Sequence, residues 1–223
     1  MTISNRRRPI TERRWLLLPV LLAGAGCQTA PAPPPQVSVE VIEQAPWRRV
    51  ASSDDVARLD QLASAWSDRL AAARRAGHAR RIAAEGALLE PGVSLPQALL
   101  PPGSYRCRVL RLAGSSRRTA LIVFPTHFCH VGHDGEHLSL IKQTGTERPG
   151  GYLWEDRENR MIFLGADALG SEQEPPAYGA NRRRDVVGVV ERVGPFRYRV
   201  AMLRMAPAAE LDVLELVPAP AQN

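Results

Sequence analysis

Apolar side chains between residues 52 and 90 recur every three or four positions, which is the spacing of one face of an α-helix. The stripe consists of Val56, Leu59, Leu62, Ala63, Trp66, Leu70 and Ala73. Ser52 or Ser53 is suited to cap the helix N-terminus, and Gly77 suits its C-terminal end. A second, weaker helix is expected over 79–90. We expect the apolar stripe, Trp66 included, to pack in the core.

From Tyr105 onward the period shortens, and runs of β-type residues alternate with turn residues. Eight strands are predicted: Tyr105–Leu112, Thr119–Val131, Glu136–Thr144, Gly151–Glu155, Arg160–Gly165, Val186–Val193, Phe196–Leu203 and Leu211–Val217. Alternation is clearest over 196–200, apolar toward the core and cationic away from it. Asp134-Gly135 signals a hairpin, and Pro125 is expected to break the second strand or bend it between sheets.

These elements predict an α+β fold, in which a helical arm precedes an antiparallel eight-stranded β-meander. Tight turns favour a meander that closes into a barrel, because closure removes exposed strand edges. A two-sheet β-sandwich is the alternative. The expected organisation is a signal peptide, a Pro-rich linker, the helical arm, the barrel-like domain and a tail, at 1–26, 27–46, 47–102, 103–218 and 219–223.

The first 27 residues have the layout of a bacterial export signal. Five arginines precede a short apolar run over 15–23, and small residues at 24–26 lead into Cys27. The run is shorter than the roughly 20 residues that span a bilayer. Cys27 resembles the acylated cysteine of bacterial lipoproteins, although Gly24 stands where that pattern usually has leucine, so cleavage without acylation stays open. We expect a location on the periplasmic side of the cell envelope, attached to a membrane through lipid on Cys27; a soluble periplasmic protein is the alternative.

Composition changes this picture once the leader is set aside. The chain has 29 basic and 23 acidic side chains, but the leader holds five arginines and one acid, which leaves 24 and 22. The basic pI therefore comes mostly from the leader, and we expect no nucleic-acid partner.

Three cysteines in an exported protein leave one without a disulfide partner. Assigning Cys27 to lipid leaves Cys107 and Cys129, in segments that the meander makes neighbours. We expect these two to form a disulfide in an oxidising compartment. The alternative is a pair of buried free thiols.

The connection over 166–184 is long for a compact domain, and such loops often bind ligands. It carries Tyr178 and the run Arg182, Arg183 and Arg184, which are the candidate binding residues. The alternative is a solvated excursion packed only by Tyr178.

Other candidate chemistry is weak. Four of the five histidines fall within 127–137, and His133, Glu136 and His137 come nearest to a metal site. Their spacing matches no established zinc pattern, so we expect solvated turn residues, with no metal and no cofactor. Asp185, Glu191 and Arg192 are expected to form structural salt bridges, and the usual hydrolase and phosphate-binding motifs are missing.

Several stretches together resemble the proteobacterial envelope family catalogued as domain of unknown function 4893. They are Gly103–Arg108, Lys142–Gly145, Arg160–Gly165, Tyr178-Gly179, Arg184–Gly188, Glu191-Arg192 and Leu211–Leu216, and the likeness covers about 47–218. The resemblance implies an exported, disulfide-bearing protein and no particular activity. We expect a non-enzymatic module that binds an envelope protein or a small apolar ligand; the alternative is an envelope hydrolase with an unrecognised site.

Overall fold

The computed structural model describes residues 45–204 and 210–220. The expectations for the leader, for Cys27 and for nearly all of the Pro-rich linker lie outside these residues. All of the described residues belong to one compact unit. Among the described residues, no helix combines the length and the apolar character needed to cross a membrane.

The helical arm begins with a short 3₁₀ turn, η1 (Pro46–Arg49), and continues in α1 (Ser53–Ala73). Ser52 caps α1, because its hydroxyl accepts a hydrogen bond from the backbone N–H of Asp55 at 3.2 Å. The chain then bends through Arg74–His78, where Gly77 has φ of 94°. Gly77 therefore marks a bend between two helices, as glycine at positive φ allows.

The second helix is shorter than expected. α2 spans Ala79–Glu85, and a 3₁₀ turn at Gly86–Leu88 (η3) follows it. The prediction of helix to residue 90 is wrong, because the backbone at Gly86 turns to φ 57° and ψ −133°. No residue with a side chain adopts that conformation readily.

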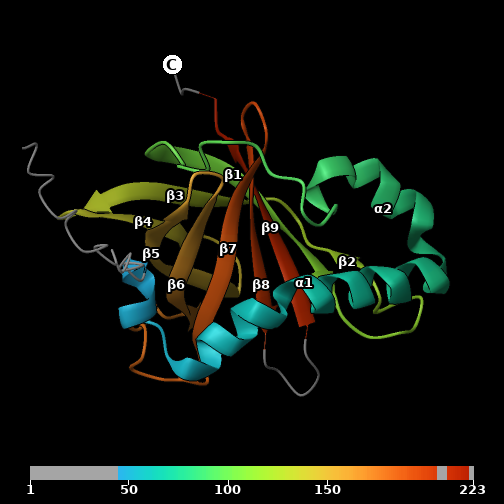
Figure 1. Cartoon of the computed structure of the whole chain (residues 1–223), viewed down its shortest axis with the longest axis horizontal. Coiled ribbons are helices and arrows are strands. Elements are labelled where there is room, and N and C mark those ends of the chain that lie inside the picture. Colours follow the sequence, from blue (N-terminus) through green and yellow to red (C-terminus); the bar gives the residue numbers. More distant parts are fainter. Residues whose placement is uncertain (1–44, 205–209, 221–223) are drawn as a thin grey trace, which may run out of the picture. The chain divides into compact units, whose positions relative to one another are not determined.

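Nine antiparallel strands follow in the part of the chain that the structure describes. They are β1 (Gly103–Leu112), β2 (Ile122–Val123), β3 (His127–Asp134), β4 (His137–Lys142), β5 (Glu147–Arg157), β6 (Arg160–Leu169), β7 (Asp185–Gly194), β8 (Arg197–Arg204) and β9 (Glu210–Pro218). Strands β3 to β9 pair in chain order, and β1 pairs with both β3 and β9. The predicted closed meander is thus confirmed, and no sandwich forms (Figure 1).

The extra strand arises where Pro125 interrupts the second predicted strand. β2 pairs with β1 at Leu110 and Arg111, whereas β3 pairs with β1 over 103–107. Proline has no backbone N–H to donate to a neighbouring strand. The predicted break at Pro125 is therefore confirmed, and eight strands close the barrel with β2 as a short addition.

Two apolar clusters lie on opposite faces of the barrel wall. The interior cluster includes Tyr105, Phe163 and Leu214. The second cluster lies between the outer face of the wall and the helical arm, and it includes Trp66, which is 3% exposed. The expected core position of Trp66 is confirmed.

Alternation along β8 follows the prediction only in part. Tyr198 and Val200 belong to the interior cluster, so Arg197 and Arg199 point away from it. Phe196, however, is 73% exposed in the turn before β8, and Arg199 is 0% exposed beneath the helical arm. The expectation of a core-facing Phe196 is therefore wrong. Arg199 points away from the interior as predicted, and it is buried because the helical arm covers that face of the barrel.

Candidate functional site

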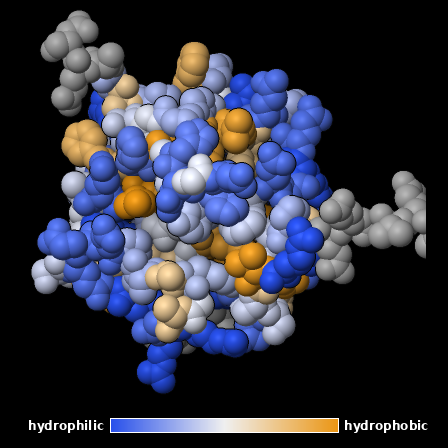
Figure 2. Space-filling view, turned by 90° about the vertical axis from the view of Figure 1, so that its left-hand side faces the viewer, coloured by the Kyte–Doolittle hydropathy of each residue, from blue (hydrophilic) through white to orange (hydrophobic). Residues whose placement is uncertain are grey.

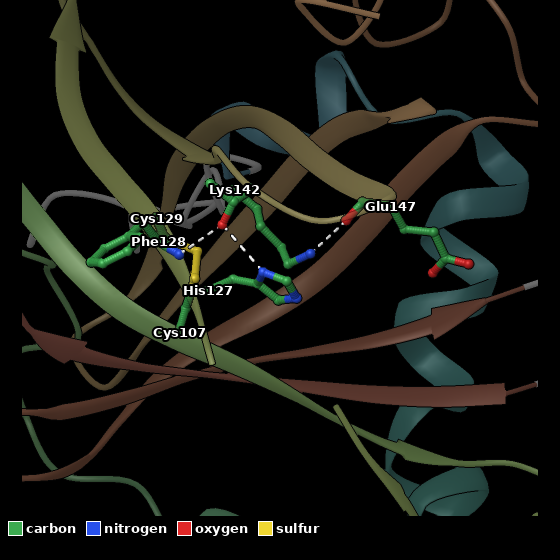
Figure 3. The surroundings of a disulfide bond; sticks show 7 residues. Cys107, His127, Phe128, Cys129, Lys142 and Glu147 are labelled. Carbon is green, nitrogen blue, oxygen red and sulfur yellow. Dashed lines mark hydrogen bonds between the residues drawn. A yellow bond between two sulfur atoms is a disulfide. The ribbon is translucent and has the colours of Figure 1, made fainter. Parts of the chain in front are cut away.

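The predicted disulfide links β1 to β3. The sulfur atoms of Cys107 and Cys129 are bonded, and the two Cα atoms are 5.9 Å apart (Figure 3). Both cysteines are almost completely buried. The bond lies within the interior cluster, next to the end of the barrel where the charged side chains gather.

A network of charged side chains lies in the barrel interior, at the end of the barrel where β6 and β8 end and β5 and β9 begin. Asp212, only 1% exposed, accepts hydrogen bonds from Arg111 at 2.7 and 2.8 Å and from Arg204 at 2.5 Å. Arg204 also pairs with Asp167, and Arg111 with Glu147 at 2.7 Å. The hydrogen bond with Asp212 raises the pKa of Arg111, although burial opposes this change. The network links β1, β5, β6, β8 and β9 and keeps these charges compensated.

Lys142 and His127 lie beside this network (Figure 3). The Lys142 Nζ donates to the backbone carbonyl of Glu147 at 2.8 Å, and the His127 ring lies 3.2 Å from the hydroxyl of Thr144. Burial lowers the pKa of Lys142; burial and the nearby Lys142 charge lower the pKa of His127. Both side chains line a cavity of only about 70 Å³. That volume suits one or two water molecules, each about 30 Å³ in the liquid, rather than an organic ligand.

A much larger cavity lies at the same end of the barrel, and Arg204 lines both. This mouth cavity measures about 620 Å³, within the range of roughly 300–1,000 Å³ typical of ligand sites. Its lining residues are Ser52, Asp54, Asp55, Arg58, Asp167, Arg182, Arg183, Asp185, Val186, Leu203 and Arg204. They come from the start of α1, the ends of β6 and β8, the start of β7 and the loop before β7.

Four aspartates and four arginines line the mouth cavity, but most of them already have partners. Arg58 pairs with Asp55, and Asp185 accepts a hydrogen bond from a backbone N–H at 3.0 Å. Arg182 and Arg183 are exposed and form no ion pair with any residue that the structure describes. These two rim arginines are therefore the cationic groups available to a ligand.

The candidate binding loop divides into two kinds of residue. The Tyr178 hydroxyl accepts a hydrogen bond from the Ser52 backbone N–H at 3.0 Å and donates one to Asp55, which fixes the loop against the start of α1. Arg184 donates to the Asp167 carbonyl at 2.9 Å and to Glu172 at 3.0 Å. Tyr178 and Arg184 thus hold the loop in place, and Arg182 and Arg183 remain as the binding candidates.

The histidine-rich hairpin is arranged differently from the expected geometry. His133 lies opposite Leu138, and Asp134 lies opposite His137, so the two turn residues are Gly135 and Glu136, one position beyond the predicted Asp134-Gly135. The His137 ring packs against Trp154, with the ring centres 5.0 Å apart. Within the described ranges, no group of three or more His, Cys, Asp or Glu side chains is placed to hold a metal ion.

The salt bridges predicted for Asp185, Glu191 and Arg192 are confirmed in part. Glu191 pairs with Arg199 at 2.7 Å, and Arg192 donates to the backbone carbonyl of Pro96 at 2.7 Å. Asp185, which lies at the mouth cavity, accepts a backbone hydrogen bond and forms no salt bridge with a described residue. These three side chains do not form a paired acid and base.

A family model matches residues 47–216, which is most of the chain, and its description is "Domain of unknown function (DUF4893)". The chain belongs to the DUF4893 family. The resemblance seen in the sequence is therefore confirmed. No curated protein matches this DUF4893 chain. Among solved structures, a redesigned beta barrel shares 9% identity with it, covering 56% of this chain and 96% of the barrel, with a TM-score of 0.36.

Proposed function

We propose that this DUF4893 protein is an exported, lipid-anchored envelope protein, whose barrel is a non-enzymatic module that binds an anionic group. The mouth cavity, with Arg182 and Arg183 at its rim, carries the proposal. Arginine donates several hydrogen bonds in a planar fork that matches carboxylate and phosphate groups. The barrel interior is filled by side chains, so a ligand has to bind at the surface of the barrel rather than inside it.

A binding role fits this cavity better than hydrolysis. Hydrolysis needs an acid and a base, or a nucleophile and a base, within reach of the substrate. Three of the four aspartates in the lining are already engaged by an arginine or a backbone N–H. The fourth, Asp54, is exposed on the first turn of α1. The lining therefore supports recognition of charge and offers no paired groups for bond cleavage.

The anchor is tested by metabolic labelling with radioactive palmitate in a bacterial host. We expect label on the wild-type protein and none on Cys27→Ser, because Cys27 follows the small-residue cleavage region. A Cys107→Ala variant is the control and should keep its label. Unlabelled wild-type protein that is freely soluble in the periplasm would contradict lipid anchoring and leave the soluble alternative.

The cavity is tested by calorimetric titration with inorganic phosphate, citrate and a short polyglutamate peptide. We expect at least one probe to bind, and the double variant Arg182→Gln/Arg183→Gln to weaken binding about 100-fold, since a hydrogen bond to a charged group contributes roughly 1.5–3 kcal/mol.

The double variant Arg49→Gln/Arg106→Gln is the control for the cavity test. It removes the same charge from exposed positions that do not line the mouth cavity. Equal weakening in both double variants would show that net charge alone is responsible. Failure of all three probes to bind would count against an anion site at the mouth.

A further inference from the structure

Three pairs of consecutive arginines meet where the helical arm bends. Arg74 and Arg75 follow α1, Arg80 and Arg81 lie in the first turn of α2, and Arg117 and Arg118 lie in the loop after β1. All six are exposed. We call this group of six side chains the basic elbow.

Hydrogen bonds bring the separate segments of the basic elbow together. His78, only 6% exposed, lies at the bend, and its Nε2 is 2.8 Å from the backbone carbonyl oxygen of Arg117. Arg69 donates to the carbonyl of Ala113 at 3.0 Å, which fixes the start of the same loop against α1. Figure 1 shows the bend between α1 and α2 at one end of the helical arm. Arginines about 40 positions apart in sequence thus lie on one fixed surface.

Acidic side chains are missing from both segments that build the basic elbow. Residues 69–84 contain no aspartate or glutamate, and neither do residues 111–133. None of the six arginines forms an ion pair with a residue that the structure describes. The side chains between them are alanine, glycine, serine and the buried His78, so no bulky group covers the guanidinium groups. Charge on this surface is concentrated and uncompensated.

We propose that the basic elbow docks on anionic lipid headgroups of the membrane to which the protein is anchored. This inference rests on the proposed lipid attachment, which would hold the domain near a membrane. Arginine pairs phosphate oxygens through two hydrogen bonds at a time, and clustered basic residues are attracted by the negative potential of anionic lipids. A single acyl chain binds weakly, and a basic patch supplies a second attachment signal.

Electrostatic docking without insertion fits the composition of the elbow. Its uncharged exposed side chains are small, and none of the large exposed apolar side chains belongs to it. Figure 2 shows the opposite side of the molecule, the left-hand side of Figure 1, where apolar side chains lie as separate spots among polar ones. Attraction between charges is screened within about 8–10 Å at ordinary ionic strength. Salt should therefore weaken the docking.

The test is sedimentation of the protein with vesicles, one set containing phosphatidylglycerol and one of phosphatidylcholine alone. The protein used is the chain from Gln28 onward, exported through an unrelated cleavable leader. It contains all of the compact unit and lacks Cys27, so the result does not depend on lipid attachment. We expect sedimentation with phosphatidylglycerol vesicles only, and its loss on addition of salt.

The variant Arg75→Gln/Arg80→Gln/Arg118→Gln takes one arginine from each pair and should weaken partitioning about 100-fold, at roughly fivefold for each basic residue. The control Arg49→Gln/Arg106→Gln/Arg157→Gln removes the same charge from exposed positions outside the elbow and should leave most of the partitioning intact. Circular dichroism should show that both variants fold.

Three results would overturn the proposal: equal binding to both vesicle types, equal weakening in both triple variants, or no vesicle binding by a chain that binds heparin. The last would indicate a soluble polyanion as the partner. If the protein does not sediment with vesicles but Cys27 is still labelled with palmitate, the docking surface is rejected and the proposed lipid anchor stands.

Discussion

Replacing Arg199 by leucine should lower the free energy of unfolding by about 3–5 kcal/mol, which is the usual cost of removing one partner of a buried ion pair. The guanidinium is fully buried and donates to four backbone carbonyls between Ala87 and Val93, at 2.7 to 3.1 Å. It also pairs with Glu191 at 2.7 Å and lies over the ring of Trp66. The variant would leave a carboxylate and four carbonyls without their donor. Urea unfolding followed by circular dichroism measures the change.

Two further variants separate the causes of this loss. Arg199→Lys keeps the charge but lacks the planar fork, so it should recover only a small part of the lost stability. Arg157→Leu removes an arginine whose side chain is 68% exposed and should change the free energy of unfolding by less than about 0.5 kcal/mol. A loss below about 1 kcal/mol in Arg199→Leu would show that water replaces the guanidinium at these carbonyls.

Removing the disulfide by Cys107→Ala/Cys129→Ala should lower the melting temperature by about 6–12 °C. The bond joins residues 22 positions apart, and closing a loop of that size contributes about 3 kcal/mol in the chain-entropy model. For a domain of this length, 1 kcal/mol corresponds to roughly 2–4 °C. Differential scanning calorimetry measures the shift.

Matched samples make the disulfide measurement decisive. The single variants Cys107→Ala and Cys129→Ala should each lose nearly as much as the double variant, because either one abolishes the bond. Wild-type protein that is unfolded, reduced and refolded under reducing conditions should have the melting temperature of the double variant. The prediction fails if unfolded, unreduced wild-type protein shows two free thiols, or if all variants melt together with the wild type.

Local patterns in the sequence predicted the features that depend on neighbours along the chain. Ser52 as the cap of α1 and the break at Pro125 each depend on a few consecutive residues. So does the hairpin between β3 and β4, although its turn lies one residue beyond the predicted Asp134-Gly135. The Cys107–Cys129 bond could also be predicted, because the two strands are nearly consecutive in the meander. These elements form the framework of the barrel.

Features that depend on distant segments could not be predicted in this way. Alternation places Arg199 on the outer face of β8, but only the path of the helical arm decides that this face is buried. Arg111 and its partner Asp212 are separated by 101 residues and meet only because β1 pairs with β9. The mouth cavity likewise needs the start of α1 to lie against the loop before β7. The two arginine pairs within residues 74–81 could be seen in the sequence as a basic cluster. That Arg117 and Arg118 lie beside them could not, because this depends on how the loop after β1 packs against the bend.

The double pairing of β1 has a consequence for the order in which the chain can assemble. Pairing of β1 with β3, and the disulfide between them, needs only residues up to Val131. The other edge of β1 waits for β9, which ends at Pro218, close to the end of the chain. Until β9 arrives, β1 and β8 each present an open edge to other chains. The last strand also delivers Asp212, so a chain that stops before Glu210 lacks both the closure of its sheet and the carboxylate that holds Arg111 and Arg204 together.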